Sequence, residues 1–274
     1  MKAILFVPVA DSTAWIDETL PGVSPAELPV AGRSAIEYAL EEAAKAGYDM
    51  AEVLDYRPSD RLAAAFADPS TTPLPVFYIR GEGVPPRTTE ELKKVSSPLT
   101  QNLDSGETTV VWGLKIGDVV IDGVRAWHKA NLEVVGNSPR FTLPCYSAEK
   151  GIYLGRNVVI ERGTEIKPSA LLCDNVWLKR NVSLDGDVII GSGSFVGEGA
   201  RLKNTVVCPD TYIGAELDFE NKIVAGNRII DLETQAWTEV EEPGLVRPIG
   251  GGVLAAFKWL WRFLLGRSCG GGRG

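Results

Sequence analysis

The sequence contains one histidine, His128, among its 274 residues, and this scarcity limits the chemistry open to it. Its four cysteines stand far apart and form no C-x-x-C pair (Cys145, Cys173, Cys208 and Cys269). Zinc and iron–sulfur sites need closely spaced cysteine and histidine ligands, so such a site has almost no ligand set here. A Ser-His-Asp triad would depend on His128 alone. We expect the cysteines to be reduced and mostly buried, as in a cytosolic protein.

The sequence also lacks a secretory signal and a basic body. Its first ten residues hold one lysine and about eight apolar residues, too few and too weakly charged for a signal peptide, and they predict a buried strand at Lys2–Val9. The net charge is −8, which argues against nucleic acid as a partner. The last 32 residues differ, because they carry five cations and no acid, while the rest carries −13.

What the sequence does have is a repeat. From Leu154 to Ile229, one apolar residue returns every six positions through thirteen segments, of which LKNTV alone has five residues. The first residue of a segment is Leu, Ile or Val in eleven of the thirteen, with Phe219 and Ala225 as exceptions. Half-buried strands of a sandwich would alternate with period two instead. Three short strands per coil of about eighteen residues, each pointing its first residue inward, account for period six.

The repeat therefore predicts a left-handed parallel β-helix of about four coils, and it resembles the hexapeptide-repeat family. Several segments have glycine at their second position, where we expect tight turns with unusual backbone angles. These glycines are Gly155, Gly191, Gly197, Gly214 and Gly226.

The N-terminal part begins as a β-loop-α unit. After the first strand, Ser34–Ala46 predicts a helix that Gly47 ends. Its expected inner face consists of Ile36, Tyr38, Ala39, Leu40 and Ala43. Such a unit indicates an α/β domain with a partly parallel sheet. Farther along, Asp55–Asp104 is rich in Pro, Ser and Thr and predicts a loop-rich stretch with one clear strand, Val76–Arg80.

Two segments carry a resemblance to a second family. LPVAGRSAIEYALEEAAKAG (Leu28–Gly47) and VVWGLKIGDVVIDGVRAWHKANLEVV (Val110–Val135) resemble the sugar-1-phosphate nucleotidyltransferases, in particular those that activate mannose or glucose. The resemblance implies a Rossmann-like domain joined to a C-terminal left-handed β-helix. It further implies magnesium as cofactor, but only if nucleotidyl transfer is retained; otherwise no cofactor is expected.

The chain departs from that family where phosphates would bind. The family's Gly-rich loop is replaced by FVPVADSTAW (Phe6–Trp15), without glycine or arginine, and Pro25 stands where the family has a lysine. The domain before the repeats is also shortened. These losses predict that nucleotidyl transfer is gone, because phosphoryl-type transfer depends on positioning and charge neutralisation. Asp11, Ser12 and Thr13 are candidate ligand-binding residues, or alternatively a cap on the following segment.

The predicted β-helix lacks the histidine that acts as general base in hexapeptide-type acyltransferases. The coils contain no histidine, and His128 precedes them, so we expect a structural role for it. The carboxylates at turn positions are expected to be solvated; they are Asp174, Asp185, Asp187 and Glu198. Trp177 and Phe195 occupy sixth positions and point outward, either as interface contacts or as ordinary exposed aromatics.

The tail Val253–Leu265 reads VLAAFKWLWRFLL and predicts a short amphipathic helix. At about 20 Å it is too short to cross a membrane. It would either lie on an anionic membrane surface or pack against protein. The residues expected to make these contacts are Phe257, Lys258, Trp259, Trp261, Arg262 and Phe263.

Together these patterns predict an α/β plus β protein in three parts: a degenerate nucleotidyltransferase-like domain at 1–145, a left-handed β-helix at 146–235, and an acidic linker with a basic, aromatic tail at 236–274. The leading hypothesis is a catalytically degenerate platform for assembly, binding or regulation in nucleotide-sugar or polysaccharide metabolism. The alternative is an active transferase, by nucleotidyl or hexapeptide-type acyl transfer. Expected partners are further copies of the chain through the β-helix, an active nucleotidyltransferase, and an anionic membrane surface at the inner face of the cytoplasmic membrane.

Overall fold

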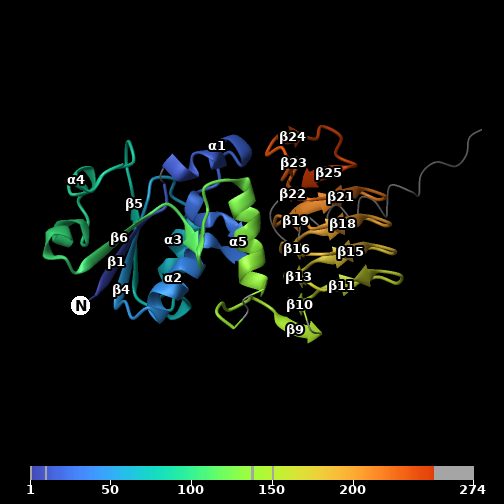
Figure 1. The fold of residues 1–274 in the computed structure, drawn as a ribbon, viewed down its shortest axis with the longest axis horizontal. Helices are drawn as coiled ribbons and strands as arrows, with labels where there is room; N and C mark the ends of the chain where they lie inside the picture. Colours follow the sequence, from blue (N-terminus) through green and yellow to red (C-terminus); the bar gives the residue numbers. More distant parts are fainter. Residues whose placement is uncertain (1, 10, 137–138, 150, 250–274) are drawn as a thin grey trace, which may run out of the picture. The chain divides into compact units, whose positions relative to one another are not determined.

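The computed structural model describes residues 2–9, 11–136, 139–149 and 151–249. The chain divides into two compact units, Met1–Pro144 and Cys145–Gly274 (Figure 1). The tail helix predicted at Val253–Leu265 lies outside the described residues, as do the six contact residues predicted within it, Phe257, Lys258, Trp259, Trp261, Arg262 and Phe263.

The first unit is built on a four-stranded sheet in the order β5-β4-β1-β6, in which all neighbouring strands run parallel. The strands are β1 (Ala3–Val7), β4 (Met50–Asp55), β5 (Val76–Arg80) and β6 (Thr108–Trp112). β1 is buried along its whole length, as expected for a central strand that is covered on both faces. The chain order reverses between β1 and β6, and in open α/β sheets ligands bind at the carboxyl edge beside such a switch.

One face of this sheet is covered by α2 (Ala35–Lys45), where the sequence predicts a helix. The carboxylate of Glu37 accepts the backbone N–H of Ser34 at 2.8 Å and thereby caps the helix start. Ile36, Leu40 and neighbouring helix residues pack with Ile4 and Phe6 of β1. The apolar face of the helix thus supplies one half of the core.

The other sheet face is covered by the later part of the stretch predicted to be loop-rich, whereas Leu62 and Phe66 from its earlier part pack on the α2 side. On that other face, Leu92 and Leu99 pack against Leu5 and Leu54. The stretch contains two helices that the sequence analysis missed, α3 (Asp60–Phe66) and α4 (Thr89–Leu92). Each begins at a side-chain cap. The Ser59 hydroxyl accepts a hydrogen bond from the Leu62 amide at 3.2 Å, and the Thr88 hydroxyl accepts one from the Glu91 amide at 3.2 Å.

The remaining elements of this unit are short, except for α5 (Val124–Gly136). The other helix is α1 (Trp15–Thr19), and the 3-10 turns are η1 (Asp11–Thr13), η2 (Pro25–Glu27), η3 (Pro69–Thr71) and η4 (Thr100–Ser105). Two hairpins are formed by β2 (Pro29–Val30) with β3 (Arg33–Ser34) and by β7 (Lys115–Ile116) with β8 (Val119–Val120).

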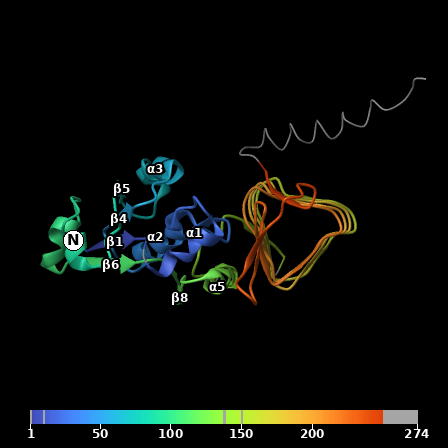
Figure 2. The ribbon, with the colours of Figure 1, turned by 90° about the horizontal axis from the view of Figure 1, so that it is seen from above.

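The second unit is a parallel β-helix with three sheets, and its coils superpose as a three-sided outline in Figure 2. One sheet contains β10 (Ile152–Leu154), β13 (Ala170–Leu172), β16 (Val188–Ile190), β19 (Val206–Val207) and β22 (Lys222–Ala225). The second contains β11 (Val159–Ile160), β14 (Trp177–Leu178), β17 (Phe195–Val196) and β20 (Thr211–Ile213). The third contains β12 (Glu165–Ile166), β15 (Ser183–Asp185), β18 (Arg201–Lys203) and β21 (Asp218–Glu220).

The register follows the predicted repeat. Trp177 pairs with Phe195, eighteen residues on, whereas Phe195 pairs with Tyr212, seventeen residues on, because the five-residue segment LKNTV lies between them. First-position residues from Leu172 to Phe219 form the core. In the first coil the apolar residues are less well covered, and Ile160 is 41% exposed.

The unusual backbone angle predicted for the second-position glycines occurs at Gly226, but Gly155, Gly191, Gly197 and Gly214 have a different reason. Gly155 and Gly197 have no positive φ, and a Cβ on them would lie 2.6 Å and 2.5 Å from the backbone of the next coil. Close approach between coils therefore requires glycine there. Many of the positive φ values in the coils occur at fourth positions, for example at Asn157, Asn175 and Asn181.

The last predicted segment does not continue the coil. The chain turns at Gly226 (φ +61°), and β23 (Arg228–Asp231) runs antiparallel to β22, followed by the antiparallel β24 (Trp237–Glu239). The predicted acidic linker also contributes β25 (Val246–Pro248), which pairs antiparallel with β20. At the opposite end, β9 (Tyr146–Glu149) pairs antiparallel with β10. Antiparallel strands thus flank the parallel coils in the chain.

Candidate functional site

The candidate ligand-binding residues Asp11, Ser12 and Thr13 form η1, between β1 and α1 at the carboxyl edge of the first sheet. Thr13 is buried, and its hydroxyl donates to the carbonyl oxygen of Pro8 at 3.2 Å, so it stabilises the loop. Ser12 is half-buried. A ligand-binding role for the three residues stays a prediction.

A buried carboxylate that the sequence analysis missed organises this edge. Asp55, the last residue of β4, has no exposed surface. Its Oδ2 accepts hydrogen bonds from the Ser24 hydroxyl at 2.7 Å and from the Tyr78 hydroxyl at 3.0 Å, and its Oδ1 accepts the Arg57 amide at 2.9 Å. The Asp55 carboxylate therefore links three separate segments of the chain by hydrogen bonds. The only sequence signal was an aspartate directly after the apolar Val53 and Leu54, in a strand that also contains Glu52.

Burial raises the pKa of Asp55, although the three hydrogen bonds oppose the shift. Burial likewise raises the pKa of Tyr78, with help from the Asp55 charge, so the phenol keeps its proton and remains a donor. Because the Asp55 oxygens are engaged by protein groups, the acid positions the edge and does not present a base to solvent.

The side chain that faces outward beside Asp55 is Arg57, which is 29% exposed and forms an ion pair with Asp17 of α1. One guanidinium nitrogen, Nη1, is buried without a hydrogen-bond partner among the described residues. The same holds for Nε1 of Trp15, two residues before Asp17. Two buried donors on or beside α1 thus lack an acceptor among the described residues.

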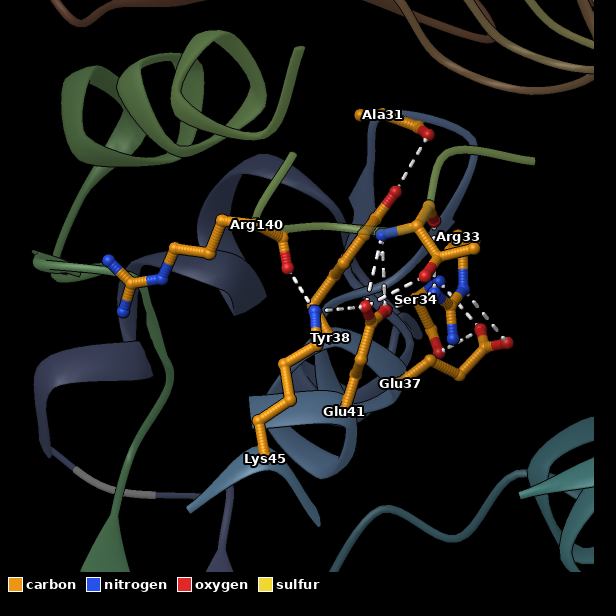
Figure 3. A network of polar contacts seen from close by, with 9 residues as sticks. Ala31, Arg33, Ser34, Glu37, Tyr38, Glu41, Lys45 and Arg140 are labelled. Atoms are coloured by element: carbon orange, nitrogen blue, oxygen red, sulfur yellow. Dashed lines mark hydrogen bonds and ion pairs between the residues drawn. The ribbon is translucent and has the colours of Figure 1, made fainter. Parts of the chain in front are cut away.

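A second polar network lies at α2 and is structural (Figure 3). Glu41 is 7% exposed and binds Arg33 at 2.9 Å and Lys45 at 2.7 Å. It also accepts the Thr142 hydroxyl at 2.8 Å. Burial opposes ionisation of Glu41, but the hydrogen bonds from Lys45, Thr142 and Arg33 outweigh it and lower its pKa. The network fastens the segment that ends the first unit to α2.

Two of the four coil carboxylates predicted to be solvated form ion pairs between successive coils, and Glu198 is exposed as expected. Asp174 pairs with Arg156 at 2.9 Å, and Asp185 pairs with Lys167 at 2.9 Å. The pKa of Asp174 is lowered, because hydrogen bonds and the charge of Arg156 outweigh burial. Ion-paired carboxylates of low pKa are poor general bases at neutral pH. His128 lies half-buried on α5 of the first unit, outside the coils.

Comparison with known proteins finds sequence similarity to acyltransferases over a short stretch. No protein-family model matches it. Over 61 residues it is 38% identical to the acyl-[acyl-carrier-protein]–UDP-N-acetylglucosamine O-acyltransferase of Chlamydia pneumoniae and 39% identical to that of Chlamydia abortus. The match covers 22% of this chain and 22% of each relative, so the chain spans about a fifth of the length of these relatives.

Among solved structures, the acetyltransferase domain of PglB from Neisseria gonorrhoeae in complex with acetyl coenzyme A matches at 16% identity and a TM-score of 0.20, covering 82% of this chain and 97% of that one. A second structure of that domain matches at 15% identity and a TM-score of 0.18, covering 83% and 98%. At such scores the whole chains do not superpose.

The similarity is thus to transferases of the hexapeptide-repeat type and does not single out nucleotidyl transfer. The leading prediction, a degenerate nucleotidyltransferase, is less well supported than its alternative, hexapeptide-type acyl transfer. Within the described residues, none of the helices combines the length and apolar character that a membrane crossing requires.

Proposed function

We propose that this chain is a hexapeptide-repeat protein of the acyl-transfer type, with left-handed coils, that acts on a nucleotide-sugar acceptor. The observation that carries the proposal is the regular three-sheet β-helix together with 38% identity over 61 residues to O-acyltransferases that use UDP-N-acetylglucosamine. In the reaction, an acceptor hydroxyl or amine attacks the carbonyl carbon of a thioester. The carbon–sulfur bond breaks, and the thiol leaves with the proton that the acceptor gave up.

The first unit is proposed to bind the acceptor at the carboxyl edge of its parallel sheet. Arg57 and Trp15 supply the unsatisfied donors, and Asp55 holds the surrounding segments in place. A nucleoside diphosphate group offers the oxygen acceptors that such donors need. This is consistent with the loss of the Gly-rich loop, because binding a sugar nucleotide does not require neutralising a phosphoryl-transfer transition state.

Oligomerisation through the β-helix is part of the same proposal. Hexapeptide-repeat acyltransferases commonly form trimers, which supports assembly of several copies. A membrane location and an active nucleotidyltransferase partner remain predictions from the sequence.

The test is a thiol-release assay on the full chain with acetyl coenzyme A or acyl carrier protein thioesters. We expect release that depends on UDP-N-acetylglucosamine, and no pyrophosphate from sugar 1-phosphates with nucleoside triphosphates and magnesium. His128→Gln assigns the base, because His128 is the only imidazole in the chain. A loss of about a hundredfold or more identifies His128 as the base, whereas retained turnover requires a base of another type.

A second candidate function follows from the absence of histidine in the coils. A β-helix without a general base is suited to a binding platform, as the sequence hypothesis has it. The two candidates separate in one experiment: a platform is stabilised thermally by nucleotide sugars without releasing thiol, whereas a transferase does both.

A further inference from the structure

The outer surfaces of the three β-helix sheets differ in chemistry. In the sheet of β12, the outward residues are polar or charged, Glu165, Ser183, Arg201 and Asp218. In the sheet of β11, the outward residues are apolar and mostly aromatic. We call this second set the aromatic face; it consists of Val159, Trp177, Phe195 and Tyr212. Their strand neighbours Leu178, Val196 and Ile213 lie in the core, so these side chains point away from it.

The rings of the aromatic face contact one another along the coil direction; Phe195 and Tyr212 are stacked, whereas Trp177 is tilted by 58° to Phe195. The centroids of Trp177 and Phe195 are 5.9 Å apart, and those of Phe195 and Tyr212 are 5.3 Å apart with an interplanar angle of 16°. The guanidinium of Arg247 lies 4.6 Å from the Tyr212 ring centroid. Sugars stack on free ring faces, but here the faces of Phe195 and Tyr212 are turned to each other, and Tyr212 also contacts a cation. Ring edges suit apolar and aromatic side chains of a protein segment better.

The chain itself leads to this face. β25 pairs with β20, which brings Arg247 opposite Tyr212. The amide of Ile249 then donates to the carbonyl oxygen of Asp210 at 2.6 Å. Ile249, the last described residue, therefore lies beside the Tyr212 end of the aromatic face.

We propose that the segment Val253–Leu265 packs across the aromatic face of its own chain. Four rungs spaced by about 4.8 Å extend roughly 15 Å, and a helix of this length is about 20 Å long. The segment is apolar except for Lys258 and Arg262, one helical turn apart.

Charge complements this fit. Glu198 and Glu216 follow β17 and β20 at the edge of the aromatic face, and both are exposed. The amide of Glu216 donates to the carbonyl oxygen of Glu198 at 2.8 Å, so the two acids stand on successive coils. Their spacing of about 5 Å matches that of two cations at positions i and i+4 on a helix, about 6 Å.

The test is hydrogen exchange of the full chain, read by mass spectrometry on peptides from 253 to 265. We expect exchange at least about tenfold slower than for an unstructured peptide, and unchanged when the protein is diluted. Phe195→Glu should restore fast exchange, whereas Ser183→Glu, at the matching position of the charged sheet, should not. Glu198→Lys with Glu216→Lys changes only exposed residues and should also accelerate exchange, which keeps the test valid if Phe195→Glu does not fold.

Three results would overturn the proposal. The first is fast exchange of the segment in the wild-type chain, or equal protection in every variant. The second is protection that appears only with vesicles of phosphatidylglycerol and phosphatidylcholine, which would assign the segment to a membrane surface. The third is protection that is lost on dilution, which would assign it to a second copy.

Discussion

The side-chain oxygen of Asn131 accepts a hydrogen bond of 2.8 Å from the backbone amide of Ala31. Ala31 has a positive φ of 40° in the turn between β2 and β3. Trp127, one helical turn before Asn131, donates from Nε1 to the carbonyl oxygen of Pro29 at 2.7 Å. The two segments that resemble the sugar-1-phosphate nucleotidyltransferases therefore contact each other, and α5 fixes the turn that precedes α2.

Replacing Asn131 by Ala should destabilise the first unit. Asn131 is 1% exposed, and its loss leaves the Ala31 amide buried without an acceptor. We expect a loss of about 1–3 kcal/mol in the free energy of unfolding, measured by urea denaturation. Lys129→Ala, on the exposed side of the same helix, is the control and should change it by less than about 0.5 kcal/mol. Equal effects would contradict the role assigned to Asn131.

Glu41→Gln should lower the free energy of unfolding by an amount that depends on pH, because Glu41 is the centre of the network in Figure 3. The pKa of Glu41 is below its ordinary value of 4.5, so its contribution is present above pH 4.5 and is lost as pH falls through the lowered pKa. At pH 7 we expect the variant to be less stable by about 2 kcal/mol, and the difference from wild type to shrink toward pH 3. Glu90→Gln, in an exposed pair with Lys93, should show almost no difference at either pH.

Glu52 should behave in the opposite way. It is fully buried on β4, its Oε2 accepts the Leu99 amide at 3.1 Å, and its Oε1 has no partner within the described structure. Burial raises its pKa, so stability is greatest below the ordinary value of 4.5 and is lost as pH rises through the raised pKa. Glu52→Gln should therefore be more stable than wild type at pH 8, by the order of 1 kcal/mol. A variant less stable than wild type at pH 8 would show that the ionised form is favoured.

Gly197→Ala should strain the β-helix, because the new methyl group would lie 2.5 Å from the Ala215 nitrogen of the next coil. We expect the free energy of unfolding to fall by about 1–3 kcal/mol, which would be seen as a lower denaturation midpoint. Glu198→Ala, the exposed neighbour, should leave the midpoint nearly unchanged. If Gly197→Ala were neutral, close approach would not explain glycine at second positions.

The coils were predictable because the prism tolerates only apolar residues at one position in six, and Leu172, Leu178 and Leu184 occupy it as expected. The end of the coils was not, because AGNRII fits the apolar pattern while Gly226 turns the chain back. Asp55 escaped prediction for another reason. Its partners Ser24 and Tyr78 are 31 and 23 residues away, and only the parallel sheet brings them together.

The most direct measurement of the central claim compares wild type with Arg57→Ala in transfer from acetyl coenzyme A to UDP-N-acetylglucosamine, following the acylated sugar nucleotide by mass spectrometry. Lys2→Ala, whose charge lies near the amino end of β1, is the control. The account predicts product from wild type and from the control, and a KM for the sugar nucleotide about tenfold or more higher in Arg57→Ala. Absence of product with every thioester, or an unchanged KM in Arg57→Ala, would contradict it.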